Sequence, residues 1–159
     1  AGCTIHRMAH ERFYEYIKML DSKCIIAFQM AHIEKHYTTK QIFDYFNVFE
    51  RKDITDTGQH MGGIRIMKNN QETRSIIQLE YDTYKANKLL VTDCYNNSQE
   101  PYFIDNRHEQ SIFSVITKLN NNVMVLKDET DVSNRKIRKN FPFFASRIKD
   151  RNLHRFHRR

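Results

Sequence analysis

The sequence predicts an α+β protein with about three N-terminal helices, a small antiparallel sheet, one further helix and a basic C-terminal tail. Apolar residues recur at helical spacing in the first half of the chain. The second half changes to short segments rich in β-branched and aromatic residues, which are typical of strands. With 159 residues and a mass of 19.2 kDa, the chain has the length of a single domain.

Three helices are predicted in the N-terminal part of the chain. The first is expected between Ile5 and Leu20, where apolar residues follow the helical period. A second helix over residues 23–36 is apolar on several faces, which predicts a central position in the core. A capping-box pattern at residues 38–41 introduces a third, shorter helix, whose apolar residues are Ile42, Phe46 and Phe49.

The second half predicts strands that are separated by polar turns. Asn69 and Asn70 suit the turn of an antiparallel hairpin formed by the first two strands. Before the last strand, Asn106 and Glu109 resemble the N-cap and its partner in a helix that extends to Leu119. The predicted strands are residues 64–68, 74–81, 88–95, 102–104 and 123–127.

The net charge of +7 is concentrated at the C-terminal end of the sequence. Residues 134–159 hold ten Lys or Arg and one acidic residue, Asp150, and therefore carry a charge of +9. Residues 1–133 hold 16 basic and 18 acidic side chains and therefore carry a charge of −2. We divide the chain accordingly into a single α+β domain, residues 1–133, and a basic Arg-rich tail, residues 134–159.

The tail predicts binding to nucleic acid. Arginine binds phosphate through two N–H groups at once, and aromatic rings stack on unpaired bases. On a helix that starts near Pro142, the later arginines of the tail fall in one stripe with aromatic residues between them. RNA is slightly preferred over DNA, because arginine-rich segments often become ordered on RNA. The predicted contacts are Arg135, Lys136, Arg138, Lys139, Arg147, Arg151, Arg155, Arg158 and Arg159.

The sequence is also compatible with partners other than nucleic acid. A protein with an acidic groove is a possible partner for the same tail. A chain of this size with 19 Tyr and Phe residues also suits an interaction factor, of a viral or phage type, that occupies a host protein complex. No membrane partner is expected, because no window approaches the roughly 18 consecutive apolar residues of a spanning helix. Three cysteines without a CxxC pair favour free thiols and an intracellular location, cytoplasmic or nuclear.

If the protein is an enzyme, the sequence favours a nuclease that uses histidines in loops. A ribonuclease needs a base, an acid and a cation around the 2′-hydroxyl and the phosphate. His60 lies in a glycine-flanked loop, His108 begins a predicted helix, and His36 is the third candidate catalytic residue. Asp93 follows an apolar run at the end of a predicted strand, but its acidic neighbours fit no nuclease core.

Metal ions and cofactors are not predicted. Histidines at i, i+4 spacing share one face of a helix, which is a geometry that zinc uses. Two such pairs occur, but the HExxH pattern is absent. Glycine-rich nucleotide-binding patterns are absent as well. The two histidine pairs are His6 with His10 and His32 with His36.

Overall fold

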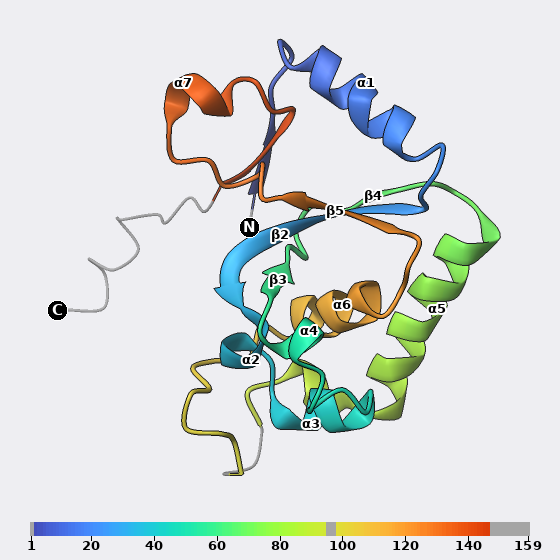
Figure 1. Ribbon diagram of the computed structural model, residues 1–159, viewed down its shortest axis with the longest axis vertical. Coiled ribbons are helices and arrows are strands. Elements are labelled where there is room, and N and C mark those ends of the chain that lie inside the picture. The colour runs from blue at the N-terminus through green and yellow to red at the C-terminus, as the bar shows by residue number, and fades with distance from the viewer. Residues whose placement is uncertain (1, 95–97, 147–159) are drawn as a thin grey trace, which may run out of the picture.

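The computed structural model describes residues 2–94 and 98–146 of the chain (Figure 1). Over these residues it contains seven α-helices and two sheets, which confirms the predicted α+β class. The larger sheet has four strands and the smaller sheet has two. In chain order the elements are β1 (Gly2–Ile5), α1 (His10–Met19), β2 (Ile25–Ile33), α2 (Glu34–Tyr37), α3 (Lys40–Tyr45), α4 (Lys52–Thr55), β3 (Gly58–His60), β4 (Ile66–Met67), α5 (Gln71–Ala86), the 3-10 helix η1 (Lys88–Val91), α6 (Glu109–Lys118), β5 (Val123–Lys127), α7 (Arg135–Arg138) and β6 (Phe143–Ser146).

The centre of the fold is strand β2, where the sequence predicts a helix over residues 23–36. The predicted central position is correct, but the predicted helix is wrong. Residues 25–28 are fully buried, because both faces of the sheet are covered. A strand of this kind is a continuous apolar run without alternation, so its pattern resembles that of a buried helix. The β-branched pair Ile25 and Ile26 is the local feature that favours a strand.

The larger sheet is mixed, whereas a small antiparallel sheet was expected. Strand β5 runs parallel to β2, in a register that extends from Ile25 opposite Val123 to Gln29 opposite Lys127. The other side of β2 pairs antiparallel with β3 and β4. The parallel pair places the C-terminal ends of β2 and β5 at the same edge of the sheet.

The predicted hairpin over residues 64–81 is wrong, because helix α5 begins at its expected turn. The side-chain oxygen of Asn70 accepts a hydrogen bond from the backbone N–H of Thr73 (2.9 Å), which caps the helix. The β-branched and aromatic residues that favour a strand are therefore divided between a buried and an exposed helical face. The buried face consists of Thr73, Ile76, Glu80 and Thr83.

The other predicted elements have mixed outcomes. The short helix α3, the helix α6 and the strand β5 are confirmed. The first helix, α1, starts only at His10, because residues 2–5 form strand β1. No strand forms over residues 88–94, where η1 lies, or over residues 102–104. Of the three predicted N-terminal helices, the first is shortened, the second is replaced by the central strand β2 and the short α2, and the short third helix forms as α3.

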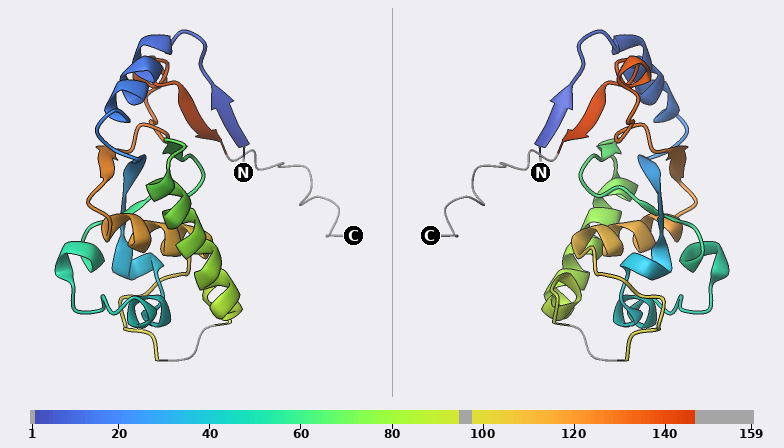
Figure 2. Two further views of the ribbon diagram at one scale, coloured as in Figure 1. Left: turned by 90° about the vertical axis from the view of Figure 1, so that its right-hand side faces the viewer. Right: turned by 90° about the vertical axis from the view of Figure 1, so that its left-hand side faces the viewer.

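Strand β2 separates two hydrophobic clusters. Its Ile25 and Ala27 belong to the cluster that is completed by α5 and α6, while Ile26 and Phe28 belong to the cluster around Tyr16 of α1. Figures 1 and 2 show the same layers, with α5 and α6 on one face of the sheet and α1 with the β1–β6 pair on the other. The small sheet and α1 thus form a separate cover over half of β2.

The part of the predicted tail that the structure describes, residues 134–146, packs against the rest of the protein. Strand β6 pairs antiparallel with β1, and the backbone N–H of Ala145 donates to the carbonyl oxygen of Thr130 (2.8 Å). The division between residues 133 and 134 stays a prediction. Residues 147–159, which hold the predicted arginine stripe, lie outside the described residues.

Candidate functional site

The three predicted catalytic histidines lie in different environments. His60 is the last residue of β3 and is 1% exposed, whereas His36 belongs to α2 and His108 directly precedes α6. The carbonyl oxygen of His36 accepts hydrogen bonds from the backbone N–H groups of Ile104 (2.8 Å) and Asp105 (3.2 Å). The segment that leads to His108 therefore runs beside His36, while His60 lies inside the core.

His60 packs against the middle of α6. Its Nδ1 lies 2.8 Å from the hydroxyl of Thr117, and its backbone N–H donates to the hydroxyl of Ser114 (2.8 Å). Burial, with a smaller contribution from the positive charge of Lys118, lowers the pKa of His60 to about 3. The imidazole is therefore neutral at physiological pH. Its catalytic role stays a prediction, and its contacts are those of a core residue.

A dyad of Asp93 and His108 forms at the N-terminal end of α6. Nε2 of His108 lies 2.7 Å from a carboxylate oxygen of Asp93, and the two side chains are 37% and 74% exposed. When Nε2–H donates to the carboxylate, Nδ1 keeps its lone pair. This Nδ1 has no hydrogen-bond partner among residues 2–94 and 98–146. A carboxylate so placed fixes the tautomer and the orientation of the imidazole.

The backbone of His108 is strained, and a buried asparagine holds it. Its φ of 54° and ψ of −122° lie in a region that residues other than glycine rarely adopt, at a cost of about 1–3 kcal/mol. Asn106, 2% exposed, accepts a hydrogen bond from the N–H of His108 (3.2 Å) and donates to the carbonyl oxygens of Leu90 and Thr92 (both 3.1 Å). The sequence predicted Asn106 as the N-cap, whereas the structure uses it to place Asp93 beside His108.

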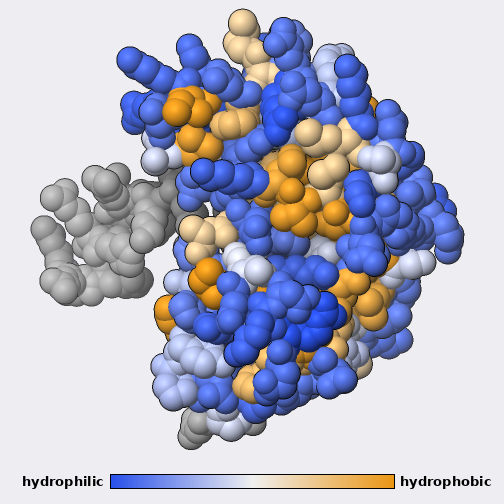
Figure 3. Space-filling view, in the orientation of Figure 1, coloured by the Kyte–Doolittle hydropathy of each residue, from blue (hydrophilic) through white to orange (hydrophobic). Residues whose placement is uncertain are grey.

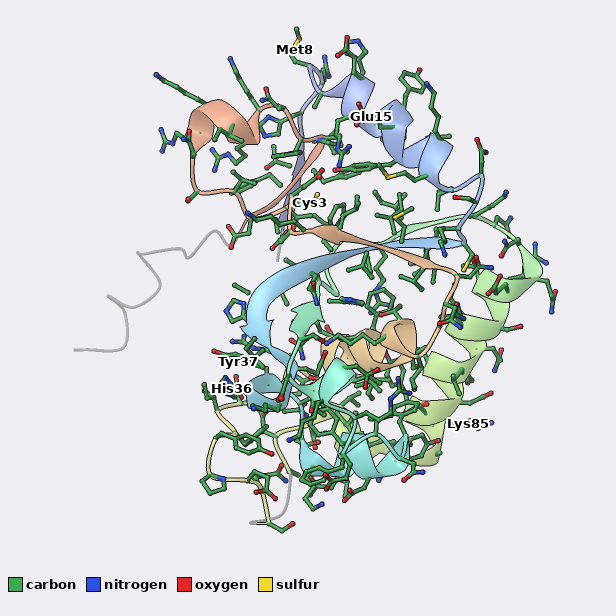
Figure 4. All side chains as sticks on the ribbon, in the orientation of Figure 1. Cys3, Met8, Glu15, His36, Tyr37 and Lys85 are labelled. Carbon is green, nitrogen blue, oxygen red and sulfur yellow. The ribbon has the colours of Figure 1, made fainter. Side chains whose placement is uncertain are left out.

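Arg107 adds a positive charge next to the dyad. Its backbone N–H donates to the carbonyl oxygen of Tyr37 (3.1 Å), and its guanidinium carbon lies 4.9 Å from the centre of the Tyr37 ring. Within the described ranges, Arg107 forms no ion pair with an acidic residue. Figure 4 shows Tyr37 and His36 together at the edge of the molecule, on α2. This edge therefore combines an imidazole–carboxylate dyad with aromatic rings and an uncompensated guanidinium.

A buried ion pair, which sequence reasoning missed, supports α6 from within. Glu34 is fully buried, and one of its carboxylate oxygens lies 2.6 Å from Nζ of Lys118 and also accepts from the hydroxyl of Ser114. The other oxygen accepts from the hydroxyl of Thr38 (2.6 Å) and the amide of Gln59 (3.1 Å). The network ties α6 to α2 and β3. Its sequence signal is a polar residue at every third position of an otherwise apolar helix, namely Ser111, Ser114 and Thr117.

The basic segment, which we define as Arg135, Lys136, Arg138 and Lys139, lies on and directly after α7. Three of its side chains are exposed, while the guanidinium carbon of Arg138 lies 4.0 Å from the centre of the Phe144 ring. None of the four forms an ion pair with the acidic residues that the structure describes. In the region of α7, Figure 3 shows a small apolar patch surrounded by hydrophilic residues. The other predicted contacts lie outside the described residues: Arg147, Arg151, Arg155, Arg158 and Arg159.

A groove of about 370 Å³ lies at the C-terminal ends of the parallel strands β2 and β5. Ligands of open α/β sheets often bind at such ends. Here the lining is apolar apart from Gln29 and Lys127. It therefore offers no cluster of polar side chains that could carry out a reaction. The lining residues are Gln29, Met30, Ala31, Ile33, Gly58, Val125, Leu126 and Lys127.

Neither a cluster of metal-ligating side chains nor a membrane-spanning helix occurs in the described part of the chain. No group of three or more His, Cys, Asp or Glu residues within residues 2–94 and 98–146 is placed to hold a metal ion. The i, i+4 histidines do not share a helix, because His6 precedes α1 and His32 lies in β2. Over the same residues, every helix is too short or too polar to cross a membrane. No protein-family model, curated protein or solved structure matches the chain.

Proposed function

We propose that the protein binds nucleic acid, with RNA preferred, through the basic residues of segment 134–159. The observation that supports this proposal is the basic segment on α7. It places four positive side chains within five residues, and no described acidic residue neutralises them. A cluster of this kind attracts phosphate groups and releases their counterions on binding.

Strand pairing extends the positive surface beyond α7. The backbone N–H of His6 donates to the carbonyl oxygen of Pro142 (2.9 Å), so the residues after β1 lie beside the chain that follows the basic segment. Arg7 comes next and is exposed, and it has no ion pair within the described ranges. Cations from both ends of the described chain therefore share one region.

The preference for RNA rests on the aromatic partner of Arg138. Its guanidinium packs against the ring of Phe144 in a half-buried position, so a cationic plane and an aromatic ring lie together beside the exposed members of the basic segment. Single-stranded RNA presents unstacked bases, and these stack on aromatic rings and guanidinium planes. Duplex DNA presents mainly phosphates to such a surface, because its bases are stacked inside the helix.

The proposal is tested by the salt dependence of RNA binding. A labelled single-stranded RNA is titrated with the full chain at several salt concentrations, and the slope of log affinity against log salt is measured. Each phosphate contact contributes about −0.7 to that slope, so the triple variant R135A/K136A/K139A should flatten it by about 2. The matched control is K68A/K85A/K88A, which removes the same charge from the α5 side, where Figure 4 labels Lys85.

Two outcomes would contradict the proposal. If both triple variants change the slope equally, net charge rather than the basic segment drives binding. If neither RNA nor DNA of the same sequence binds at low salt, nucleic-acid binding itself is wrong. A protein partner that is retained after nuclease treatment would then favour the interaction-factor alternative.

A further inference from the structure

We propose that His108 is the general base of a site that cleaves RNA, with Asp93 as its positioning residue. The inference rests on the proposed RNA binding, which would supply the substrate. Three observations carry it: the 2.7 Å hydrogen bond of an exposed dyad, the strained backbone of His108, and the buried Asn106 that maintains both. Strain that is held in place by a buried polar residue is a feature of functional sites.

The protonation pattern of the dyad suits a base. Nε2–H of His108 donates to Asp93, so the lone pair of Nδ1 accepts the proton from the substrate. The imidazolium that results is stabilised by the carboxylate at 2.7 Å. Asp93 itself does not touch the substrate, and its role is to fix the ring and its tautomer.

Arg107 supplies the charge that a phosphodiester needs. Its backbone is anchored to the carbonyl oxygen of Tyr37, and its guanidinium is held over the Tyr37 ring. Ser111 donates to the same carbonyl oxygen (2.7 Å), which fixes Tyr37 relative to the first turn of α6. Arg107 directly precedes His108 in the chain, and its proposed role is to bind the phosphate whose neighbouring ribose reacts at the dyad.

The reaction needs no cofactor. Nδ1 of His108 removes the proton of a 2′-hydroxyl, and the 2′-oxygen attacks the adjacent phosphorus. The bond between phosphorus and the 5′-oxygen breaks, and that oxygen leaves with a proton taken from water. The products are a 2′,3′-cyclic phosphate and a 5′-hydroxyl end. His108 then returns its proton to solvent, so protons and electrons balance.

The basic segment and the dyad lie on the same side of the molecule. Figure 1 shows α7, α2 and the segment that rises beside α2 toward α6 on the left, and the right panel of Figure 2 views that side directly. The backbone bonds from residues 104, 105 and 107 to α2 place the start of α6 at this edge. An RNA strand held by the basic segment would therefore bind on the side of the protein that carries the dyad.

The test measures binding and cleavage separately. Cleavage is followed with an end-labelled RNA in EDTA, and binding with a 2′-O-methyl version of the same RNA that has no nucleophile. His108→Asn should lower the cleavage rate by at least about 100-fold, because general bases contribute about 10²–10⁴-fold, and should leave binding unchanged. Asparagine, like histidine, carries a Cβ, so this variant places the same demand on the backbone at this position. His10→Ala, at an exposed histidine on α1, is the matched control and should cleave normally.

Asp93 is tested by rescue. Asp93→Asn should lower cleavage, and Asp93→Glu, which restores the carboxylate, should recover part of the rate. Equal cleavage by the native chain and His108→Asn, loss of cleavage in EDTA, or products with a 3′-hydroxyl would overturn the inference. Binding of the 2′-O-methyl RNA without cleavage of the natural RNA also overturns it and leaves the proposed function standing. Failure to bind either RNA refutes the proposed function.

Discussion

Lys118 and Glu34 form an ion pair at 2.6 Å in the interior of the protein, where their side chains are 7% and 0% exposed. Burial lowers the pKa of Lys118, and the carboxylate of Glu34 opposes this change. Lys118 also donates to the carbonyl oxygen of Ile54 (3.1 Å). The pair thus joins the end of α6 to α2 and α4, with every charge matched by a partner.

Removing one member of this pair should be strongly destabilising. Lys118→Met leaves the carboxylate of Glu34 buried without its counter-charge, so the free energy of unfolding should fall by about 3–5 kcal/mol. The double variant Glu34→Gln/Lys118→Met should recover much of this loss, because it buries no charge. Urea denaturation measures both. The control is Lys35→Met, which removes a half-exposed partner of Asp56 near the surface and should cost at most about 1 kcal/mol. A loss for Lys118→Met no larger than for the control contradicts the prediction.

His60 should make the protein less stable as the pH falls below about 6.5. Its pKa in the folded state is lowered to about 3, so between about pH 6.5 and 3 the unfolded state binds a proton that the folded state does not. The free energy of unfolding therefore rises with pH in this window, by at most about 1.4 kcal/mol per pH unit from this group. The free energy of unfolding is measured by denaturation at several pH values for the native chain and for His60→Asn. The difference between the two free energies should rise with pH at this slope. His32→Ala, at an exposed histidine, should leave the slope as it is.

Gly58 should resist substitution because the backbone of β2 comes very close to it. A Cβ added there would lie 1.9 Å from the carbonyl oxygen of Met30, so one of the two strands must move. We expect Gly58→Ala to cost about 1–3 kcal/mol, the range of overpacked cores. At Gly63 the nearest atom to an added Cβ is the sulfur of Met61 at 3.8 Å. Gly63→Ala should therefore be neutral or slightly stabilising in thermal unfolding, and equal effects at the two glycines argue against the close approach.

Asn70 should contribute to stability as the cap of α5. Asn70→Ala removes the hydrogen bond to the N–H of Thr73, and this should lower the free energy of unfolding by about 1 kcal/mol. Faster hydrogen exchange should appear in the first turn of α5. The exposed Asn121 is the matched control, and its change to alanine should stay within about 0.5 kcal/mol. If exchange in α5 is unaffected, the side chain of Asn70 does not cap the helix.

The sequence predicts the elements whose pattern has a single interpretation. Helix α6 and strand β5 follow their periods clearly. Helix α3 forms where it is predicted, but the predicted capping box does not: its N-cap is Thr39, without a side-chain cap bond, and the hydroxyl of Thr38 donates to Glu34 instead. The pattern of β2 is ambiguous, because a strand that is buried on both faces has no alternation. In α5, the β-branched residues near Ile76 favour a strand locally, whereas the Asn70 cap and packing against α6 favour the helix.

The candidate site is predictable in part. His108 is recognisable as a polar residue at the start of a helix, and Asp93 is recognisable as an acidic residue after an apolar run. Their contact is not predictable, because it depends on Asn106 joining two segments that the sequence assigns to a strand and a helix. The network around Glu34 is not predictable either. It requires that strand β2 ends directly before Glu34 and that α2 begins there, whereas the sequence predicts one helix over residues 23–36.

The pairing of β2 with β5 joins two segments that are far apart in the sequence. Ile25 lies opposite Val123, so the loop that closes when the two strands pair contains most of the chain. Contacts that are so distant in sequence form slowly, because the entropy of closing the loop is lost before the strands gain stability. Both hydrophobic clusters include residues of β2, so neither is complete until this step occurs. Helices α5 and α6 pack against each other and are closer in sequence than β2 and β5, so their contact closes a shorter loop.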